Sequence, residues 1–232
     1  MLLKYALDSL THLFFPHICA GCGSDVINQD QLLCLACTER LPLTNYHTYS
    51  DNPVEKTFWG RIPVTHATSY LYFSKDSIVQ QLMHQFKYRG NKDIGMYFGK
   101  KMGSVLLHAD RLQKADFLVP LPLHASRQRK RGFNQAEVLC HGMAETLGIP
   151  VLTQAVTRNI ETITQTHQNR TARWQNMEGK FYMPDPEMLQ NKHVILVDDV
   201  ITTGATLEAC GHELLKAQGL LLSIATLAYT SV

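Results

Sequence analysis

Long apolar runs are absent from this sequence of 232 residues, and no stretch approaches the roughly 18 consecutive apolar residues that a membrane-spanning helix needs. The first ten residues are too short an apolar run for a secretion signal, and Asp8 interrupts them. Charge is also scarce, since Asp, Glu, Lys and Arg make up 18% of the chain and the net charge is +2 with histidine neutral. We therefore expect a cytoplasmic globular protein without stable membrane insertion, in which any basic surface is local.

Cysteine is sparse too, and its placement is informative. Four of the six cysteines form two Cys-x-x-Cys pairs with eleven residues between them, namely Cys19, Cys22, Cys34 and Cys37. Two such pairs can turn four thiolates toward one tetrahedral Zn²⁺ ion, and two disulfides are the alternative. Because no secretion signal precedes the cysteines, we expect zinc. Four protein ligands leave no open coordination position, so this zinc is expected to be structural.

Three regions are predicted along the chain. Residues 1–40 combine the cysteine pairs with an N-terminal helix, because leucines recur there at helical spacing. Residues 41–60 contain prolines and many polar residues, which is typical of a connector. Residues 61–232 form the main domain.

The main domain alternates predicted strands and helices. Strands are expected at residues 64–73, 117–119, 151–156, 193–197 and 220–228, and helices at 77–108 with a break at 87–90, at 133–147 and after 205. The continuously apolar run at 193–197 is typical of a central parallel strand that is covered on both faces. The alternation predicts a doubly wound α/β fold with a mainly parallel sheet, whose ligands bind beyond the carboxyl ends of the strands.

The most telling stretch follows that central strand. Asp198 and Asp199 are expected to lie at the start of a turn that is rich in small hydroxyl residues. A helix is expected directly after this turn. The turn contains Thr202, Thr203, Gly204, Ala205 and Thr206. Paired carboxylates can accept hydrogen bonds from ribose hydroxyls, while turn amides, threonine hydroxyls and the positive end of a helix suit a 5′-phosphate. This order of residues resembles the signature of the type I phosphoribosyltransferases, which bind phosphoribosyl pyrophosphate (PRPP). An ordinary strand-to-helix turn is the alternative.

A basic run lies at residues 127–131, where four of the five residues are Arg or Lys. It follows a predicted strand and is expected to leave the sheet at the same edge as Asp198 and Asp199. Arginine can hold phosphate oxygens bidentately, so the run suits a pyrophosphate. It also suits a DNA or RNA backbone, with Tyr88, Phe133 and Trp174 as surfaces on which bases can stack. A solvated loop is the alternative.

Residues 158–176 form a polar, arginine-containing segment between two predicted strands. Loops of this length inside a compact domain are usually functional or disordered. We predict a lid that closes over the ligand, and an exposed connecting loop is the alternative.

Taken together, these segments resemble the ComF/ComFC (GntX-like) family of competence proteins. The resemblance rests on the cysteine pairs, the Arg-Gly-Phe-Asn-Gln stretch at 131–135, the series from Arg158 through Gln165, Arg173 and Asn176 to Phe181, and the Asp198-Asp199 signature. It covers nearly the whole chain in the right order. It implies a type I phosphoribosyltransferase-like fold with a small N-terminal zinc module. It also implies a role in natural transformation and DNA uptake, with incoming single-stranded DNA handled in the cytoplasm beside a DNA-uptake or helicase partner.

The resemblance also assigns residues to a PRPP site. Asp198 and Asp199 would hold the ribose hydroxyls and act in catalysis, and residues 202–206 would hold the 5′-phosphate. The pyrophosphate loop would consist of Leu121, Pro122, Leu123 and His124, with Arg127, Arg129 and Arg131 nearby. The lid would contain Arg158, Gln165, Arg173 and Asn176.

The reaction implied is displacement at the anomeric carbon of PRPP, with pyrophosphate leaving as its Mg²⁺ complex. Positive charge develops on the ribose in such a transition state, as it does in glycoside hydrolysis. Two other functions stay open: a non-catalytic protein that senses PRPP, and a nucleotide-salvage or regulatory phosphoribosyltransferase unrelated to DNA.

Overall fold

The computed structural model describes residues 17–25, 27–28, 30–109, 112, 114–158 and 180–230. The predicted N-terminal helix and three predicted lid residues, Gln165, Arg173 and Asn176, lie outside these described residues. Within the described ranges, no helix combines the length and the apolar character that crossing a membrane requires.

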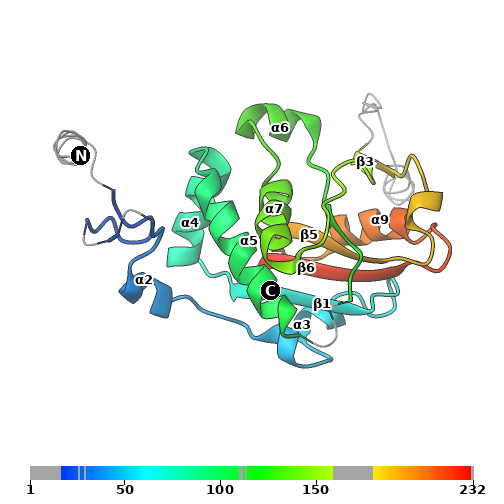
Figure 1. Ribbon diagram of the computed structural model, residues 1–232, viewed down its shortest axis with the longest axis horizontal. Coiled ribbons are helices and arrows are strands. Elements are labelled where there is room, and N and C mark those ends of the chain that lie inside the picture. The colour runs from blue at the N-terminus through cyan, green and yellow to red at the C-terminus, as the bar shows by residue number, and fades with distance from the viewer. Residues whose placement is uncertain are drawn as a thin grey trace, which may run out of the picture.

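A parallel sheet of four strands forms the centre of the protein (Figure 1). Its order is β1 (His66–Tyr72), β6 (Leu221–Tyr229), β5 (His193–Ile201) and β2 (Phe117–Pro120). Every neighbouring pair in this sheet is parallel. The predicted α/β fold with a parallel sheet is therefore confirmed.

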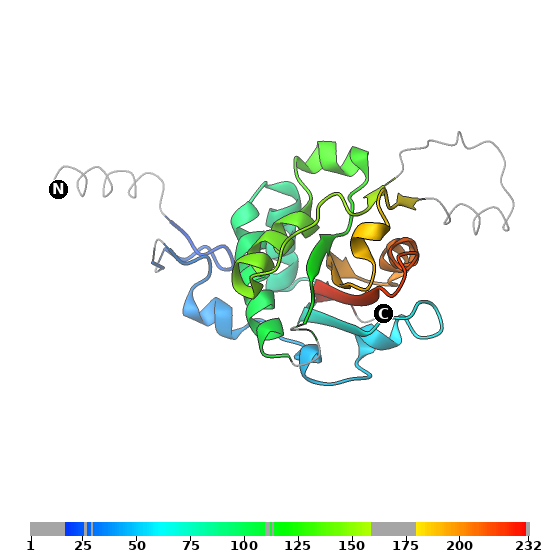
Figure 2. The same ribbon diagram turned by 45° about the vertical axis from the view of Figure 1, so that its right-hand side comes forward.

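One face of the sheet is covered by three helices, α4 (Ile78–Tyr88), α5 (Lys92–Leu107) and α7 (Gln135–Leu147). Ile195 and Val197 of β5 belong to the apolar cluster on this face. Figure 2 shows these green helices on one side of the strands, with the orange helix α9 (Ala205–Leu214) on the other.

The opposite face packs against α9 and the short helix α3 (Pro53–Lys56). Val194 and Leu196 belong to this second cluster, so successive residues of β5 alternate between two apolar layers. This alternation explains why the sequence of β5 is continuously apolar, and it confirms the doubly wound arrangement.

Helices α5 and α7 approach each other closely because glycines face each other across their contact. A Cβ atom added at Gly99 would lie 2.4 Å from the Leu139 carbonyl oxygen, and one at Gly142 would lie 2.6 Å from the Met96 carbonyl oxygen. Neither position has room for a side chain, so the two backbones pack directly against each other.

The helices that follow β2 and β5 lie on opposite faces of the sheet, since α7 covers the first layer and α9 the second. Two adjacent parallel strands whose connections diverge in this way leave a crevice beyond their carboxyl ends. The sequence that leaves β2 at Pro120 and β5 at Ile201 therefore borders the predicted ligand site.

The segment predicted as a connector, residues 41–60, packs against the sheet. It contains the 3₁₀ helix η1 (Tyr46–Thr48) and α3, and it buries Val54 and Phe58 in the second apolar layer. The buried Asn52 side chain caps α3 and donates hydrogen bonds to the carbonyl oxygens of Tyr46 and Ala67. The domain boundaries remain a prediction, but these residues do not form a loose linker.

The predicted strand at residues 151–156 is wrong, because only Val151 forms a single bridge, to Leu118. The chain instead forms a small antiparallel pair further on, β3 (Thr157–Arg158) with β4 (Phe181–Tyr182). The remaining elements of the described ranges are the helices α2 (Leu35–Glu39), α6 (Ala125–Arg131) and η2 (Glu187–Leu189).

Candidate functional site

Asp198 and Asp199 lie inside strand β5 and not in the turn that the sequence predicts. Strand β5 continues to Ile201 because β6 runs beside it, with Asp198 opposite Thr226 and Val200 opposite Ala228. Adjacent strand residues point to opposite faces of a sheet. The side chains of Asp198 and Asp199 therefore point to opposite faces of the sheet.

Asp199 faces the layer of α4, where two cations meet it. The Lys87 Nζ lies 3.0 Å from the Asp199 Oδ2, and a guanidinium nitrogen of Arg131 lies 3.9 Å from the same oxygen. Arg131 also donates to the Gln135 Oε1 at 2.6 Å, which orients its guanidinium. Lys87 was not predicted from the sequence, where the available signal is a lysine in the last turn of an otherwise apolar helix face.

Asp198 points toward the other face. Burial and the neighbouring charge of Asp199 raise the pKa of Asp198 to about 8, although the Asp199 backbone N–H, Lys87 and Arg131 act in the opposite direction. That N–H donates to the Asp198 Oδ1 at 2.7 Å. Burial, reinforced by the charge of Asp198, also raises the pKa of Cys210 on α9. The unliganded site thus disfavours two full negative charges, and hydrogen-bond donors from a ligand would relieve this repulsion.

The loop between β5 and α9 contains the predicted phosphate-binding residues. Thr202, Thr203 and Thr206 are exposed to solvent, and α9 begins at Ala205. Gly204 has a φ of +72°, and a Cβ atom there would lie 2.8 Å from a methyl carbon of Thr57. The loop therefore passes tightly over the segment around α3 and leaves its hydroxyl groups open to solvent.

Arg61 supports this loop from below. It donates to the Thr203 carbonyl oxygen at 2.8 Å and forms an ion pair with Glu208 in the first turn of α9. Arg61 was not predicted as part of the site, since nothing in the sequence connects it with residues more than a hundred positions away.

The predicted pyrophosphate loop, residues 121–124, joins β2 to α6. Leu121 is anchored by both of its backbone groups, because its N–H donates to the Val197 carbonyl oxygen at 2.9 Å and its carbonyl oxygen accepts from the Asn134 side chain at 3.0 Å. The next two residues, Pro122 and Leu123, are partly exposed. His124 caps α6, since its Nδ1 accepts from the Ser126 N–H at 3.3 Å. The loop is thus held beside β5, one strand from Asp198.

The basic run at residues 127–131 is helical, although no helix was predicted there from the sequence. It forms most of α6, which ends at Gly132 with a φ of +79°. Its residues are good helix formers, and His124 and Gly132 cap the two ends. Arg127 and Arg129 are exposed, and Arg131 turns back toward Asp199. The basic charges therefore line one rim of the crevice.

Arg158 of β3 lies on the other side of the crevice. Burial and the charge of Arg127 lower the pKa of Arg158, while Asp198 acts in the opposite direction. Its guanidinium carbon lies 5.3 Å from the ring centre of Phe181. Arg158, the described member of the predicted lid set, therefore lies within electrostatic range of Arg127 and of Asp198.

The three aromatic residues predicted as stacking surfaces have different outcomes. Phe133 is a core residue and offers no stacking surface, because it is only 8% exposed and packs against Phe86, with ring centres 5.7 Å apart. Trp174 lies outside the described residues. Tyr88, at the end of α4, is 54% exposed.

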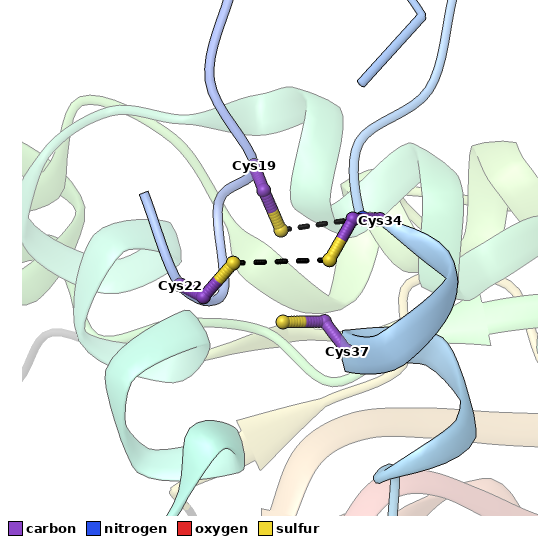
Figure 3. A group of neighbouring side chains, drawn as sticks. All are labelled: Cys19, Cys22, Cys34 and Cys37. Atoms are coloured by element: carbon purple, nitrogen blue, oxygen red, sulfur yellow. Dashed lines mark hydrogen bonds between the residues drawn. The ribbon is translucent and has the colours of Figure 1, made fainter. Parts of the chain in front are cut away.

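The four paired cysteines converge on one point (Figure 3). Their sulfur atoms all lie within 4.8 Å of one another, and the Cys22 and Cys34 sulfurs are 3.7 Å apart. A tetrahedral zinc with Zn–S bonds of about 2.3 Å places its sulfur ligands about 3.8 Å apart. The four cysteines are free, and 3.7 Å is far beyond a disulfide bond of about 2.05 Å. The cluster could therefore hold a metal ion.

The thiols of the cluster differ in how readily they ionise, because burial and the neighbouring cysteine side chains raise the pKa of Cys37 whereas backbone N–H groups favour the Cys19 thiolate. Burial opposes ionisation of Cys19, but N–H groups of Cys34, Cys22 and Gly21 outweigh it and lower the pKa of Cys19 to about 6. The Cys34 N–H lies 3.2 Å from the Cys19 sulfur. Cys19 and Cys37 also belong to the apolar layer around α4, so the cluster is packed onto the main domain.

Comparison with known proteins fits this arrangement. The family described as "Phosphoribosyl transferase domain" matches residues 134–231, which include the acid pair and the threonine loop. The DNA utilization protein YhgH of Escherichia coli (strain K12) is 32% identical over 203 residues, which cover 86% of this chain and 84% of that protein. Competence protein F of Haemophilus influenzae is 28% identical over 209 residues, which cover 88% of this chain and 87% of that protein.

The chain belongs to the ComF family. Among solved structures, this ComF-family chain is similar to the glutamine PRPP amidotransferase of Bacillus subtilis, with a TM-score of 0.41 and 19% identity over 61% of this chain and 30% of that one. Similarity at this level concerns the fold alone. The phosphoribosyltransferase fold expected from the sequence is confirmed, together with a four-cysteine cluster at its N-terminal side.

Proposed function

We propose that this ComF-family chain binds PRPP in the crevice beyond the carboxyl ends of β2 and β5. The observation that carries the proposal is the meeting of three groups at one edge of the sheet. They are an acid pair in β5, a solvent-open threonine loop at the start of α9, and the arginines of α6. The three groups match the hydroxyl, phosphate and pyrophosphate parts of PRPP.

Each group has a chemical role in this proposal. Asp198 and Asp199 accept hydrogen bonds from the ribose hydroxyls, and residues 202–206 offer amides and hydroxyls to the 5′-phosphate. Arg127, Arg129 and Arg131 neutralise the pyrophosphate from the α6 rim. When transfer occurs, the bond between the anomeric carbon and the pyrophosphate oxygen breaks as the acceptor binds that carbon. The carboxylates then stabilise the positive charge that develops on the ribose.

Two metal ions belong to the proposal. The four cysteines suit Zn²⁺, which prefers tetrahedral thiolate sites, and with no open position it would stabilise the fold. Mg²⁺ would enter on the pyrophosphate, as it commonly does with phosphate substrates, and would help this group to leave.

The biological role follows from the relatives. One is named for DNA utilization and another for competence. We propose that this chain handles incoming single-stranded DNA in the cytoplasm, together with a DNA-uptake or helicase partner. The exposed cations of α6 support this role, because they are available to a phosphate backbone.

Calorimetric titration with Mg-PRPP tests the proposed site. The wild type should bind, and the double variant Asp198→Asn/Asp199→Asn should not. Asp116→Asn is a matched control, because it removes a carboxylate at the opposite, N-terminal end of β5, where Asp116 accepts from the His193 N–H at 2.8 Å. Equal heats of binding for the wild type and the double variant would refute the site. Release of pyrophosphate with candidate acceptors then distinguishes a transferase from a PRPP sensor.

A further inference from the structure

Tyr88 is an exposed aromatic ring bracketed by cations. The Lys130 Nζ lies 5.9 Å from its ring centre, and the guanidinium carbon of Arg131 lies 5.5 Å from it. On its own helix, the His84 ring lies 5.2 Å away at an interplanar angle of 47°. Since more than half of Tyr88 remains exposed, a planar group from a ligand has access to this ring.

This ring stands at the rim of the proposed PRPP site. Arg131 contacts both Tyr88 and Asp199, and Lys87, the residue before Tyr88, pairs with the same carboxylate. A ligand that lies on Tyr88 is therefore next to the crevice without occupying it.

Beside Tyr88, a groove runs along α4 to the four-cysteine cluster, and it begins at His84, whose ring contacts Tyr88. It is a cavity of about 880 Å³ between residues 17–23 and α4, and its lining includes Gln81, His84 and Arg89. The Gln85 side chain ties the two walls together by donating to the Ala20 carbonyl oxygen at 2.8 Å. Its lining is rich in amide, imidazole and guanidinium groups, which can hydrogen-bond to the edges of nucleic-acid bases.

The charges around this surface favour a polyanion. Arg89, Lys92, Arg127, Arg129 and Lys130 are all exposed. Asp93 is an acidic residue in the groove lining, and Lys92 stands directly before it at the start of α5. Cations beside an exposed aromatic ring are the combination that proteins use to bind single strands, because every base has a face that can stack. A duplex would not use Tyr88 in this way, since its bases are already stacked on one another.

We propose that Tyr88 and the groove between α4 and residues 17–23 bind single-stranded nucleic acid. One base stacks on Tyr88 in place of Lys130, which then contacts a neighbouring phosphate. The next bases enter the groove beside Gln81, His84 and Arg89. This inference rests on the proposed role in handling single-stranded DNA, and it gives the zinc module a function as one wall of the strand-binding surface.

Fluorescence anisotropy with a labelled oligothymidylate and the full, zinc-loaded chain tests the inference. Tyr88→Ala should weaken binding by about 5- to 150-fold, which corresponds to one stacked base, and Tyr88→Phe should bind like the wild type. Lys130→Gln should reduce the slope of log K against log salt by about 0.7, the value for one phosphate contact to a single strand. The double variant Gln81→Ala/His84→Ala tests the groove and should also weaken binding.

Tyr49→Ala is the matched control, because Tyr49 is 46% exposed but lies beside η1, which contacts β1 at the other edge of the sheet. Tyr88→Ala should keep the wild-type melting temperature and the wild-type affinity for Mg-PRPP. If the wild type binds the oligonucleotide and Tyr88→Ala binds it equally well, the inference is wrong although the proposed function stands. If the wild type does not bind it at all, the proposed DNA role fails together with the inference.

Discussion

Replacing Asp198 by asparagine should stabilise the unliganded protein at alkaline pH while removing its proposed ligand binding. Burial and the charge of Asp199 raise the pKa of Asp198 from its ordinary 3.8 to about 8. Between these two values the folded protein keeps a proton that the unfolded chain loses. The free energy of unfolding therefore falls as the pH rises through this interval, and the loss is complete above about pH 8. Asparagine, which is neutral at every pH, avoids this loss.

The size of the effect has an upper limit. One pKa unit is worth about 1.4 kcal/mol, so a shift of about four units allows at most roughly 6 kcal/mol. Asp198 is only partly buried, so solvent screens its charge and we expect about 1 to 3 kcal/mol. For a chain of this length, 1 kcal/mol changes the melting temperature by about 2–4 °C.

Scanning calorimetry at pH 5 and pH 9 measures this effect. Asp198→Asn should melt higher than the wild type at pH 9, and the difference should be small at pH 5. Asp116→Asn supplies a control of opposite sign. The His193 N–H, opposed by partial burial and aided by Lys192, lowers the pKa of Asp116, so its charge stabilises the fold above its ordinary pKa and this contribution is lost as the pH falls. A lower melting temperature of Asp198→Asn at pH 9 would refute the electrostatic reasoning.

Three further predictions concern other parts of the protein. Gly99→Ala should destabilise the fold by about 1–3 kcal/mol in urea unfolding, because its Cβ would collide with the Leu139 carbonyl oxygen; an unchanged midpoint would contradict the close packing of α5 and α7. Cys22→Ser should lower the measured zinc content and the melting temperature, and an unchanged zinc content would count against the four-cysteine site. Lys87→Met should lower the free energy of unfolding by up to about 3 kcal/mol, because Asp199 loses its nearer cation. Adding Asp199→Asn should restore most of this loss. Additive effects in the double-mutant cycle would mean that the two side chains do not interact.

The central part of the fold could be predicted because its signals are local. The continuous apolar run in β5 indicated a strand covered on both faces, and the helical periodicity of α4, α5 and α7 indicated the helices. The end of β5 was misplaced because it depends on β6, which pairs with β5 as far as Ile201. The length of a strand is decided by its neighbour as much as by its own residues.

Helix α6 shows a different reason for failure. None of its residues is buried, so the apolar periodicity that reveals other helices is absent from it. Its helix formers and its glycine end were the remaining signals, and the run of basic charge obscured them.

The candidate site was predictable where its residues are contiguous. The acid pair and the threonine loop stand together in the sequence, and so do the arginines of α6. Lys87 and Arg61 could not be assigned in this way, since only the packing of α4 and of the segment after α3 brings them to the site. In the sequence, a single lysine and a single arginine resemble ordinary surface residues until these contacts are known.

The support beneath the threonine loop has a consequence for how the protein can be divided. Gly204 rests on Thr57 and Phe58, and Arg61 holds the Thr203 carbonyl oxygen. A truncated chain that starts at residue 61 would keep every residue of the proposed PRPP site. It would lose Thr57 and Phe58, against which the threonine loop packs. Weak PRPP binding by such a fragment would reflect the loss of this packing support and would not contradict the proposed site. The smallest unit suited to binding studies therefore begins before α3, because the segment from α3 to Arg61 supports the proposed ligand site.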